Sequence, residues 1–249
     1  MRVIYETKGK AREYFELAVN LYSGCTHGCT YCYAPQVAHK SRLEFSRVQP
    51  RKDLIKNLEL DCIELEQIGE TRPILMSFLT DPYQPLPHHT SITSEAINTI
   101  KAHGLKVAIL SKAGNCCDID LMDSKDWFGQ TLTFDNPYDS IEYEPNASSP
   151  LWRLHSLRVV HNTGIQTFAS CEPIIKPEQT LNLIKQSSDY VDRFLVGKWN
   201  YDNRAKLINW AKVANSVIEL LDSLGKSYYI KKDLAAYIGH PEGIKLEAK

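Results

Sequence analysis

Residues 20–35, NLYSGCTHGCTYCYAP, place Cys25, Cys29 and Cys32 within eight positions. The segment follows a short apolar run that is typical of a strand, so the three thiols belong to the loop after that strand. A structural zinc site normally has four ligands in two pairs. Here the second pair is missing, although His27 could serve as a ligand. The segment therefore predicts a metal centre, and its spacing alone leaves the kind of metal open.

The number of thiols indicates which kind of metal centre is expected. A conventional electron-transfer [4Fe–4S] cluster takes four cysteine thiolates. With three thiolates one iron stays open, and an open iron can bind a substrate-like ligand. The segment therefore favours a cluster that performs chemistry at its open iron.

The composition is that of an ordinary globular chain without a dominant charge. The 249 residues are 43% hydrophobic, and 29 basic against 30 acidic side chains give a formal charge of −1. This balance argues against tight, salt-driven binding of nucleic acid, but not against a local basic groove. Seven cysteines are an odd number, which argues against a disulfide framework. We find no signal-peptide pattern and no apolar run of membrane-spanning length, and expect a cytoplasmic protein without membrane contact.

Short apolar, β-rich runs alternate with helical patterns along the chain. Most of the runs are continuously apolar, which is typical of parallel strands buried on both faces. Six strands are expected, over residues 15–22, 74–79, 106–111, 131–134, 166–171 and 193–197.

Helices are expected between these strands. One covers 54–68, one covers 91–103, one begins at the pair Ser149-Pro150, and the last covers about 203–224. The alternation predicts an α/β fold, either a β/α barrel or an open doubly wound sheet, with the chemistry at the C-terminal ends of the strands. We expect one domain over 1–249, with a core at about 14–224 and an extension over 225–249 that adds a short strand and a turn.

Several motifs together resemble the radical S-adenosylmethionine (SAM) superfamily. The cysteine spacing, the aromatic Tyr31 and the position after the first strand are similar to the cluster loop of that superfamily. Four segments resemble its spore photoproduct lyase-like branch: NLYSGCTHGCTYCYAP, SFLTDPYQP (77–85), ILSKAG (109–114) and YEP…RLHSL…GIQTFASCEPIIKP (143–177). The resemblance extends from about residue 14 to 200. It implies a partial (β/α)6 TIM-type barrel.

The resemblance also implies an enzyme with two cofactors. In this superfamily SAM binds the open iron of a [4Fe–4S] cluster through its amino and carboxylate groups. An electron from the cluster then cleaves SAM to methionine and a 5′-deoxyadenosyl radical, which abstracts hydrogen from a substrate. The same chemistry implies an external one-electron donor of the flavodoxin or ferredoxin type.

Roles for individual residues follow from the resemblance and from their places at strand ends. Cys25, Cys29 and Cys32 are the expected cluster ligands. The expected cofactor-binding residues are Tyr31, Tyr33, Ser77, Thr80, Asp81, Ser111, Lys112, Thr133 and Lys198.

Two neighbouring residues are the catalytic candidates. Glu172 could bind ribose or substrate, and the thiol of Cys171 could donate a hydrogen atom. Ordinary alternatives stay open. Asp81 followed by proline can mark a turn, Thr133 can simply favour a strand, and a strand cysteine such as Cys171 is often a small buried apolar residue.

The motifs leave the substrate open. Spore photoproduct lyase proper uses a cysteine shortly before the aspartate that ends the second strand, whereas residues 76–81 contain none and Phe78 stands near its place. Thymine-dimer repair by that thiol is therefore not expected. Basic residues around Phe45, within 39–53, could follow a nucleic-acid backbone or form a solvated surface. Three hypotheses remain: a radical SAM enzyme acting on a nucleobase or nucleic acid, one acting on a small molecule or peptide, and a non-catalytic iron–sulfur or zinc scaffold.

Overall fold

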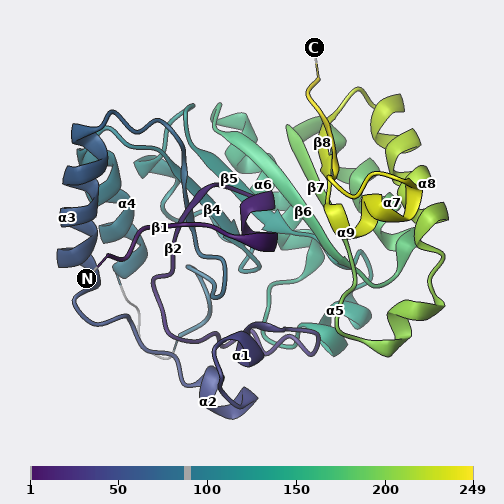
Figure 1. Ribbon diagram of the computed structural model, residues 1–249, viewed down its shortest axis with the longest axis horizontal. Helices are drawn as coiled ribbons and strands as arrows, with labels where there is room; N and C mark the ends of the chain where they lie inside the picture. Colours follow the sequence, from purple (N-terminus) through teal and green to yellow (C-terminus); the bar gives the residue numbers. More distant parts are fainter. Residues whose placement is uncertain (1, 87–90, 249) are drawn as a thin grey trace.

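The computed structural model describes residues 2–86 and 91–248, whose strands form one open sheet (Figure 1). The spatial order of the strands follows the chain from β1 to β9. β2 to β8 are parallel, and β1 and β9 pair antiparallel at the two edges. The strands are β1 Tyr5–Glu6, β2 Leu17–Val19, β3 Ile74–Met76, β4 Val107–Ser111, β5 Trp127–Thr131, β6 Gln166–Ile174, β7 Arg193–Lys198, β8 Ser227–Ile230 and β9 Ile244–Leu246.

Helices connect the parallel strands, and most of them cover one face of the sheet. The α-helices are α1 Ala34–Val37, α2 Arg42–Ser46, α3 Leu54–Gln67, α4 Ile92–Ala102, α5 Pro137–Tyr143, α6 Pro150–Asn162, α7 Pro177–Ser187, α8 Trp210–Ser223 and α9 Lys232–Ala235. Short 3₁₀ helices are η1 Gly9–Glu13, η2 Ile119–Leu121, η3 Ser188–Tyr190, η4 Asn203–Leu207 and η5 Ala236–Ile238.

The sheet buries apolar side chains on both faces, which explains the continuous apolar runs in the sequence. Alternate residues of each strand belong to two separate clusters. The larger cluster lies between the sheet and the helices. The smaller one, formed by Ala18, Leu75, Ala108, Phe168 and Leu195, lies on the opposite face of the sheet. A curved parallel sheet with helices outside is the α/β partial barrel that was expected, with β8 adding a parallel strand beyond the predicted six.

The predicted fourth strand was misplaced. The strand is Trp127–Thr131, so it shares only Thr131 with the expected range 131–134. Gly129 and Gln130 obscured the apolar pattern. A Cβ atom at Gly129 would lie 2.3 Å from the ring of Phe168, so only glycine fits there. Gln130 is fully buried in spite of its amide group.

The predicted last helix is two helices. Residues 203–207 form the 3₁₀ helix η4, and α8 begins at Trp210. The side chain of Asn209 caps α8 by accepting a hydrogen bond of 3.0 Å from the Lys212 N–H, which separates the two helices. Leu207, at the end of η4, is consequently 87% exposed.

The expected extension over 225–249 forms part of the sheet. β8 pairs with β7, β9 pairs with β8, and α9 with η5 packs beside α8. No helix within residues 2–86 and 91–248 is both long and apolar enough to cross a membrane.

Candidate active site

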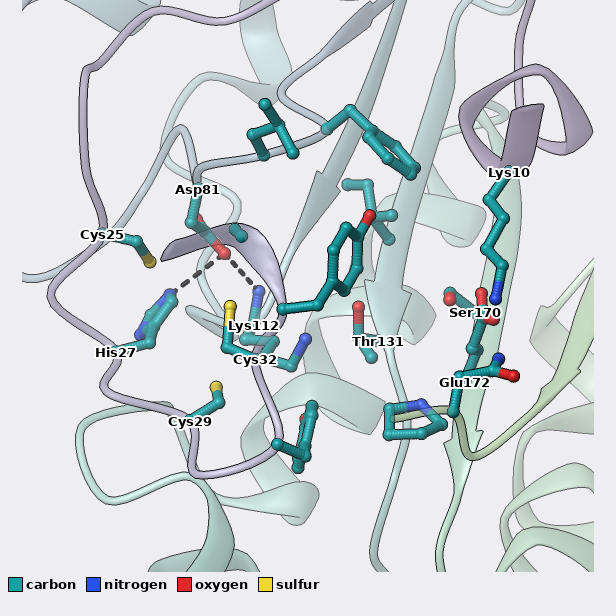
Figure 2. A pocket seen from close by; sticks show the side chains of 18 of the residues that line it. Lys10, Cys25, His27, Cys29, Cys32, Asp81, Lys112, Thr131, Ser170 and Glu172 are labelled. Carbon is teal, nitrogen blue, oxygen red and sulfur yellow. Dashed lines mark hydrogen bonds and ion pairs between the residues drawn. The ribbon is translucent and has the colours of Figure 1, made fainter. Parts of the chain in front are cut away.

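A cavity of about 170 Å³ opens at the C-terminal ends of the parallel strands. The cysteine loop after β2 forms one wall, and Ser170 and Glu172 of β6 lie across the cavity from it (Figure 2). Cys25, Cys29 and Cys32 all line this cavity, and all three thiols are free. The fold thus brings the three cysteines to the edge where parallel-sheet proteins carry their chemistry.

The cysteine loop is held by hydrogen bonds from distant segments. Arg42 of α2 donates to the carbonyl oxygens of Cys29 at 3.0 Å and Thr30 at 2.6 Å. Gln84 accepts from the Thr26 N–H at 2.8 Å and donates to the Gly24 carbonyl at 3.2 Å. These contacts fix the backbone of the loop that carries the three thiols.

The Cys29 side chain is buried, whereas Cys25 and Cys32 are partly exposed. Burial raises the pKa of Cys29 to about 12, although the nearby Lys112 lowers it in part. Burial and the neighbouring Asp81 carboxylate raise the pKa of Cys25. A cysteine binds metal as the thiolate, so a metal that binds Cys25 and Cys29 displaces their protons.

The donor set fits a [4Fe–4S] cluster. Within the described ranges no three His, Cys, Asp or Glu side chains converge well enough to hold one metal ion. A cubane does not require such convergence, because each thiolate binds a different iron. Three free thiols around one cavity therefore match the three thiolates that would hold such a cluster.

Asp81 is the centre of a hydrogen-bond network beside the cysteines. Its carboxylate accepts from the Ser111 hydroxyl at 2.8 Å and from the Lys112 N–H at 2.7 Å. His27 Nε2 lies 3.0 Å from Asp81 Oδ2 (Figure 2). Burial alone would raise the pKa of Asp81, but His27 and these hydrogen bonds outweigh it and leave the pKa lowered. An ionised Asp81 thus joins the ends of β3 and β4 to the cysteine loop.

A buried ion pair holds Tyr31. Arg153 of α6 donates to Glu144 at 2.5 Å, and both side chains are at most 1% exposed. The phenol of Tyr31 donates to the other Glu144 oxygen, and the Lys112 ammonium lies 5.8 Å from the centre of the Tyr31 ring. Burial raises the pKa of Tyr31, and the Glu144 carboxylate raises it further. Tyr31 is thereby a neutral, fixed wall of the cavity.

A second polar cluster forms the opposite wall. Lys231 donates to Glu172 Oε2 at 2.5 Å, and the Tyr14 hydroxyl donates to the same oxygen at 3.0 Å. The Lys231 ammonium lies 3.7 Å from the centre of the Tyr14 ring. A Cβ atom on Gly197 would lie 2.7 Å from Glu172 Cδ and 2.9 Å from Lys231 Cδ, so glycine makes room for the pair.

Most of the residues predicted for the site line this cavity. In addition to the three cysteines, the lining contains Tyr31, Tyr33, Thr80, Asp81, Lys112, Glu172 and Lys198. Ser77, Ser111 and Thr133 lie behind it. The Ser111 hydroxyl donates a hydrogen bond to Asp81, and the Thr133 hydroxyl lies 3.3 Å from the Tyr31 hydroxyl. Ser77 Oγ accepts a hydrogen bond of 3.4 Å from the Leu21 N–H.

Cys171 lies on the other face of its strand. Its neighbours Ser170 and Glu172 line the cavity, whereas Cys171 is 1% exposed within the large apolar cluster. Burial raises the pKa of its thiol to about 12. The structure therefore brings Glu172 to the site but not Cys171, as the alternation of side chains along a strand requires.

The sequence did not predict several residues of the site. Tyr14 follows η1, Lys231 follows β8, and Glu144 and Arg153 belong to a connection between strands. None of them ends a predicted strand. The segments YEP and RLHSL did contain Glu144 and Arg153, and their inclusion in the family resemblance was the one available signal.

The basic stretch after the cysteine loop has a structural role at two positions. Arg42 binds the loop carbonyls, and Lys40 donates to the Ser23 carbonyl at 2.9 Å. These two cations therefore hold the loop, and at these positions the stretch is not a free basic surface.

Comparison of the sequence with known proteins finds one uncharacterized relative. No protein-family model matches the chain. An uncharacterized protein of Methanocaldococcus jannaschii is 27% identical over 167 residues, which are 63% of this chain and 60% of that protein. This chain thus spans about three fifths of that relative's length.

Solved structures of two radical SAM enzymes have a similar fold. A spore photoproduct lyase variant with bound AdoMet and dinucleoside spore photoproduct matches with a TM-score of 0.65 and 18% identity, over 82% of this chain and 62% of that chain. SuiB of Streptococcus suis, bound to S-adenosylmethionine, matches with a TM-score of 0.60 and 12% identity, over 83% of this chain and 47% of that chain. The chain therefore has the α/β fold of spore photoproduct lyase and SuiB, and the resemblance to radical SAM enzymes is confirmed at the level of the fold.

Proposed function

We propose that this protein is a radical SAM enzyme. The observation that carries the proposal is the meeting of three free cysteines, Asp81, Lys112 and Glu172 around one cavity at the C-terminal edge of the sheet. A scaffold protein would need the thiols, but it would not need a cavity with polar residues from three further strands. The similarity in fold to enzymes solved with SAM bound supports the same proposal.

Cys25, Cys29 and Cys32 would hold the [4Fe–4S] cluster, and the cavity beside them would receive SAM. When bound, this pair supplies a 5′-deoxyadenosyl radical that abstracts hydrogen from a substrate carbon. The chain's own residues would bind SAM and orient it. The Lys112 ammonium can neutralise the SAM carboxylate, and Thr80 and Thr131 offer hydroxyls to its polar groups.

The opposite wall would bind the ribose or the substrate. Glu172 is held by Lys231 and Tyr14 at Oε2, which leaves Oε1 to accept a hydrogen bond from a ligand. The apolar side chains of Phe78, Leu79 and Leu110 line the cavity between the two walls and would exclude water from the reacting carbon.

The remaining assignments are parts of the same proposal. We propose one domain over 1–249, a cytoplasmic location, and an external one-electron donor of the flavodoxin or ferredoxin type, as the chemistry requires. Of the substrate classes, a nucleobase or nucleic acid is supported by the fold of spore photoproduct lyase, and a small molecule or peptide is the alternative.

The test is anaerobic purification followed by reduction with dithionite in the presence of SAM. We expect brown protein with about four irons and four sulfides per chain and the formation of 5′-deoxyadenosine. A Cys29→Ala variant serves as the control and should form none. Brown protein that does not cleave SAM would instead support the scaffold hypothesis.

A further inference from the structure

A second cavity, of about 370 Å³, lies beside the first. The two cavities share the loop after β7, because Lys198, Trp199, Asn200 and Tyr201 line both. The second cavity continues past this loop to Lys206, Trp210 and Tyr237. A ligand longer than the first cavity could therefore extend directly into the second.

The second cavity carries positive charge that the described parts of the chain do not neutralise. Lys198 and Lys206 line it, and neither has an ion-pair partner within residues 2–86 and 91–248. The Lys198 ammonium lies instead over the rings of Trp210 and Tyr237, at 5.4 Å and 5.6 Å. The carboxylate of Asp202 also lines the cavity, but two hydrogen bonds of 3.0 Å and 2.8 Å join it to Arg204.

The cations of this cavity decide which kind of ligand it can take. No acidic side chain of the described residues forms an ion pair with Lys198 or Lys206. Their ammonium groups therefore favour an anionic ligand that accepts hydrogen bonds.

The donor types suit a phosphate group. Arginine binds carboxylate and phosphate through its planar fork, and lysine is a common phosphate-binding residue that acts as a point charge. Here the fork of Arg204 is occupied by Asp202, and the free cations are lysines. Tyr201 and Tyr237 are 72% and 51% exposed beside them and offer flat apolar surface to the rest of such a ligand.

We propose that the second cavity is a subsite for a phosphate group of the substrate, bound by Lys198 and Lys206, while the reacting carbon lies in the first cavity. That the phosphate belongs to a substrate rests on the proposed function, whereas binding of phosphate in the second cavity does not depend on it. A phosphorylated small molecule and a nucleic-acid strand both carry this group, and the experiment distinguishes the two sources.

The experiment is calorimetric titration of the full-length protein with three phosphate probes and one control ligand. The probes are inorganic pyrophosphate, ribose 5-phosphate and a thymidine tetranucleotide, and thymidine without phosphate is the control. The titrations compare wild type with Lys198→Ala, Lys206→Ala and Lys206→Glu. Lys185→Ala on α7 is the matched control variant, because Lys185 is also exposed but lines neither cavity.

We expect Lys206→Ala and Lys198→Ala each to weaken binding of a phosphate probe about fivefold, and Lys206→Glu to weaken it more. Thymidine should not bind measurably, and Lys185→Ala should behave as wild type. Ribose 5-phosphate that binds as well as the tetranucleotide would indicate a phosphorylated small molecule. A tetranucleotide that binds much more tightly would indicate a nucleic-acid strand.

Failure to bind any phosphate probe, or binding that ignores all three lysine variants, would overturn the subsite. Lys206 is exposed on η4, so its variants should fold, and circular dichroism checks that they do. The titrations need no SAM cleavage. Lysine-dependent binding in a protein that never cleaves SAM would refute the proposed function and leave the phosphate site intact.

Discussion

Lys231 Nζ lies 2.5 Å from Glu172 Oε2, although the two residues are 59 positions apart. Glu172 belongs to β6, and Lys231 directly follows β8. The Lys231 side chain is 2% exposed and the Glu172 side chain 19%. The extension after β7 thus supplies a cation to the wall of the candidate active site. The extension is therefore part of that site as well as of the sheet.

Replacement of Lys231 should damage this wall. In Lys231→Met the Glu172 carboxylate loses its only cation among the described residues and stays largely buried, which should cost about 2–3 kcal/mol of unfolding free energy. SAM cleavage should fall as well, because Glu172 is no longer held. Urea unfolding and 5′-deoxyadenosine formation measure the two effects. Lys232→Met, next to it and exposed, is the control, and equal behaviour of the two variants would contradict the role of the pair.

The buried pair behind Tyr31 allows a sharper stability prediction. Arg153→Met leaves the fully buried Glu144 carboxylate without its cation and should lower the unfolding free energy by about 3–5 kcal/mol. The double variant Arg153→Met with Glu144→Gln removes the unpaired charge and should recover part of that loss. Arg158→Met, exposed on the same helix, is the control. A double variant that is less stable than Arg153→Met would show that the charge is not the cause.

The stability of the protein should depend on Glu70 at acid pH. Hydrogen bonds from the Arg72 guanidinium lower the pKa of Glu70 from 4.5 to about 2. A carboxyl group whose pKa is lowered on folding stabilises the folded state above its unfolded pKa, and this contribution is lost as the pH falls through the folded pKa. Wild type should therefore be more stable than Glu70→Gln at pH 6, and the difference should shrink between pH 4.5 and 2. A difference that is independent of pH would contradict the ionic origin.

The cluster assignment predicts which thiols matter. Cys25→Ser, Cys29→Ser and Cys32→Ser should each lose most of the bound iron, because each removes one thiolate from the cavity wall. Cys117→Ser, exposed in the loop after β4, and Cys171→Ala, on the far side of β6, should keep it. Iron and sulfide analysis after anaerobic reconstitution gives the result. Loss of iron in Cys171→Ala without loss of folding would show that the cluster site is not the one described.

The sequence predicted the parts of this site that depend on local pattern. Cysteine spacing is local, and the polar residues that end parallel strands meet because those ends share one edge of the sheet. Asp81, Lys112 and Glu172 were found in this way. Cys171 was a candidate for the same reason. Alternation along the strand, however, turns it to the opposite face from Glu172.

The rest depends on contacts between distant segments. Tyr14 and Lys231 reach Glu172 only because η1 and β8 flank the cavity once the sheet has formed. Strand β5 was misplaced because Gly129 and Gln130 look unsuitable for a buried strand until the ring of Phe168 is placed against that glycine. No local pattern carries that information.

The most direct test is electron paramagnetic resonance of the anaerobically reconstituted, reduced protein, recorded with and without SAM. Cysteines at three corners of a cubane leave one iron to bind the added SAM. We expect a reduced-cluster signal whose g-values shift when SAM is added, and no such signal in Cys29→Ser. A signal that is identical with and without SAM, or a protein that takes up zinc in place of iron, would contradict the account.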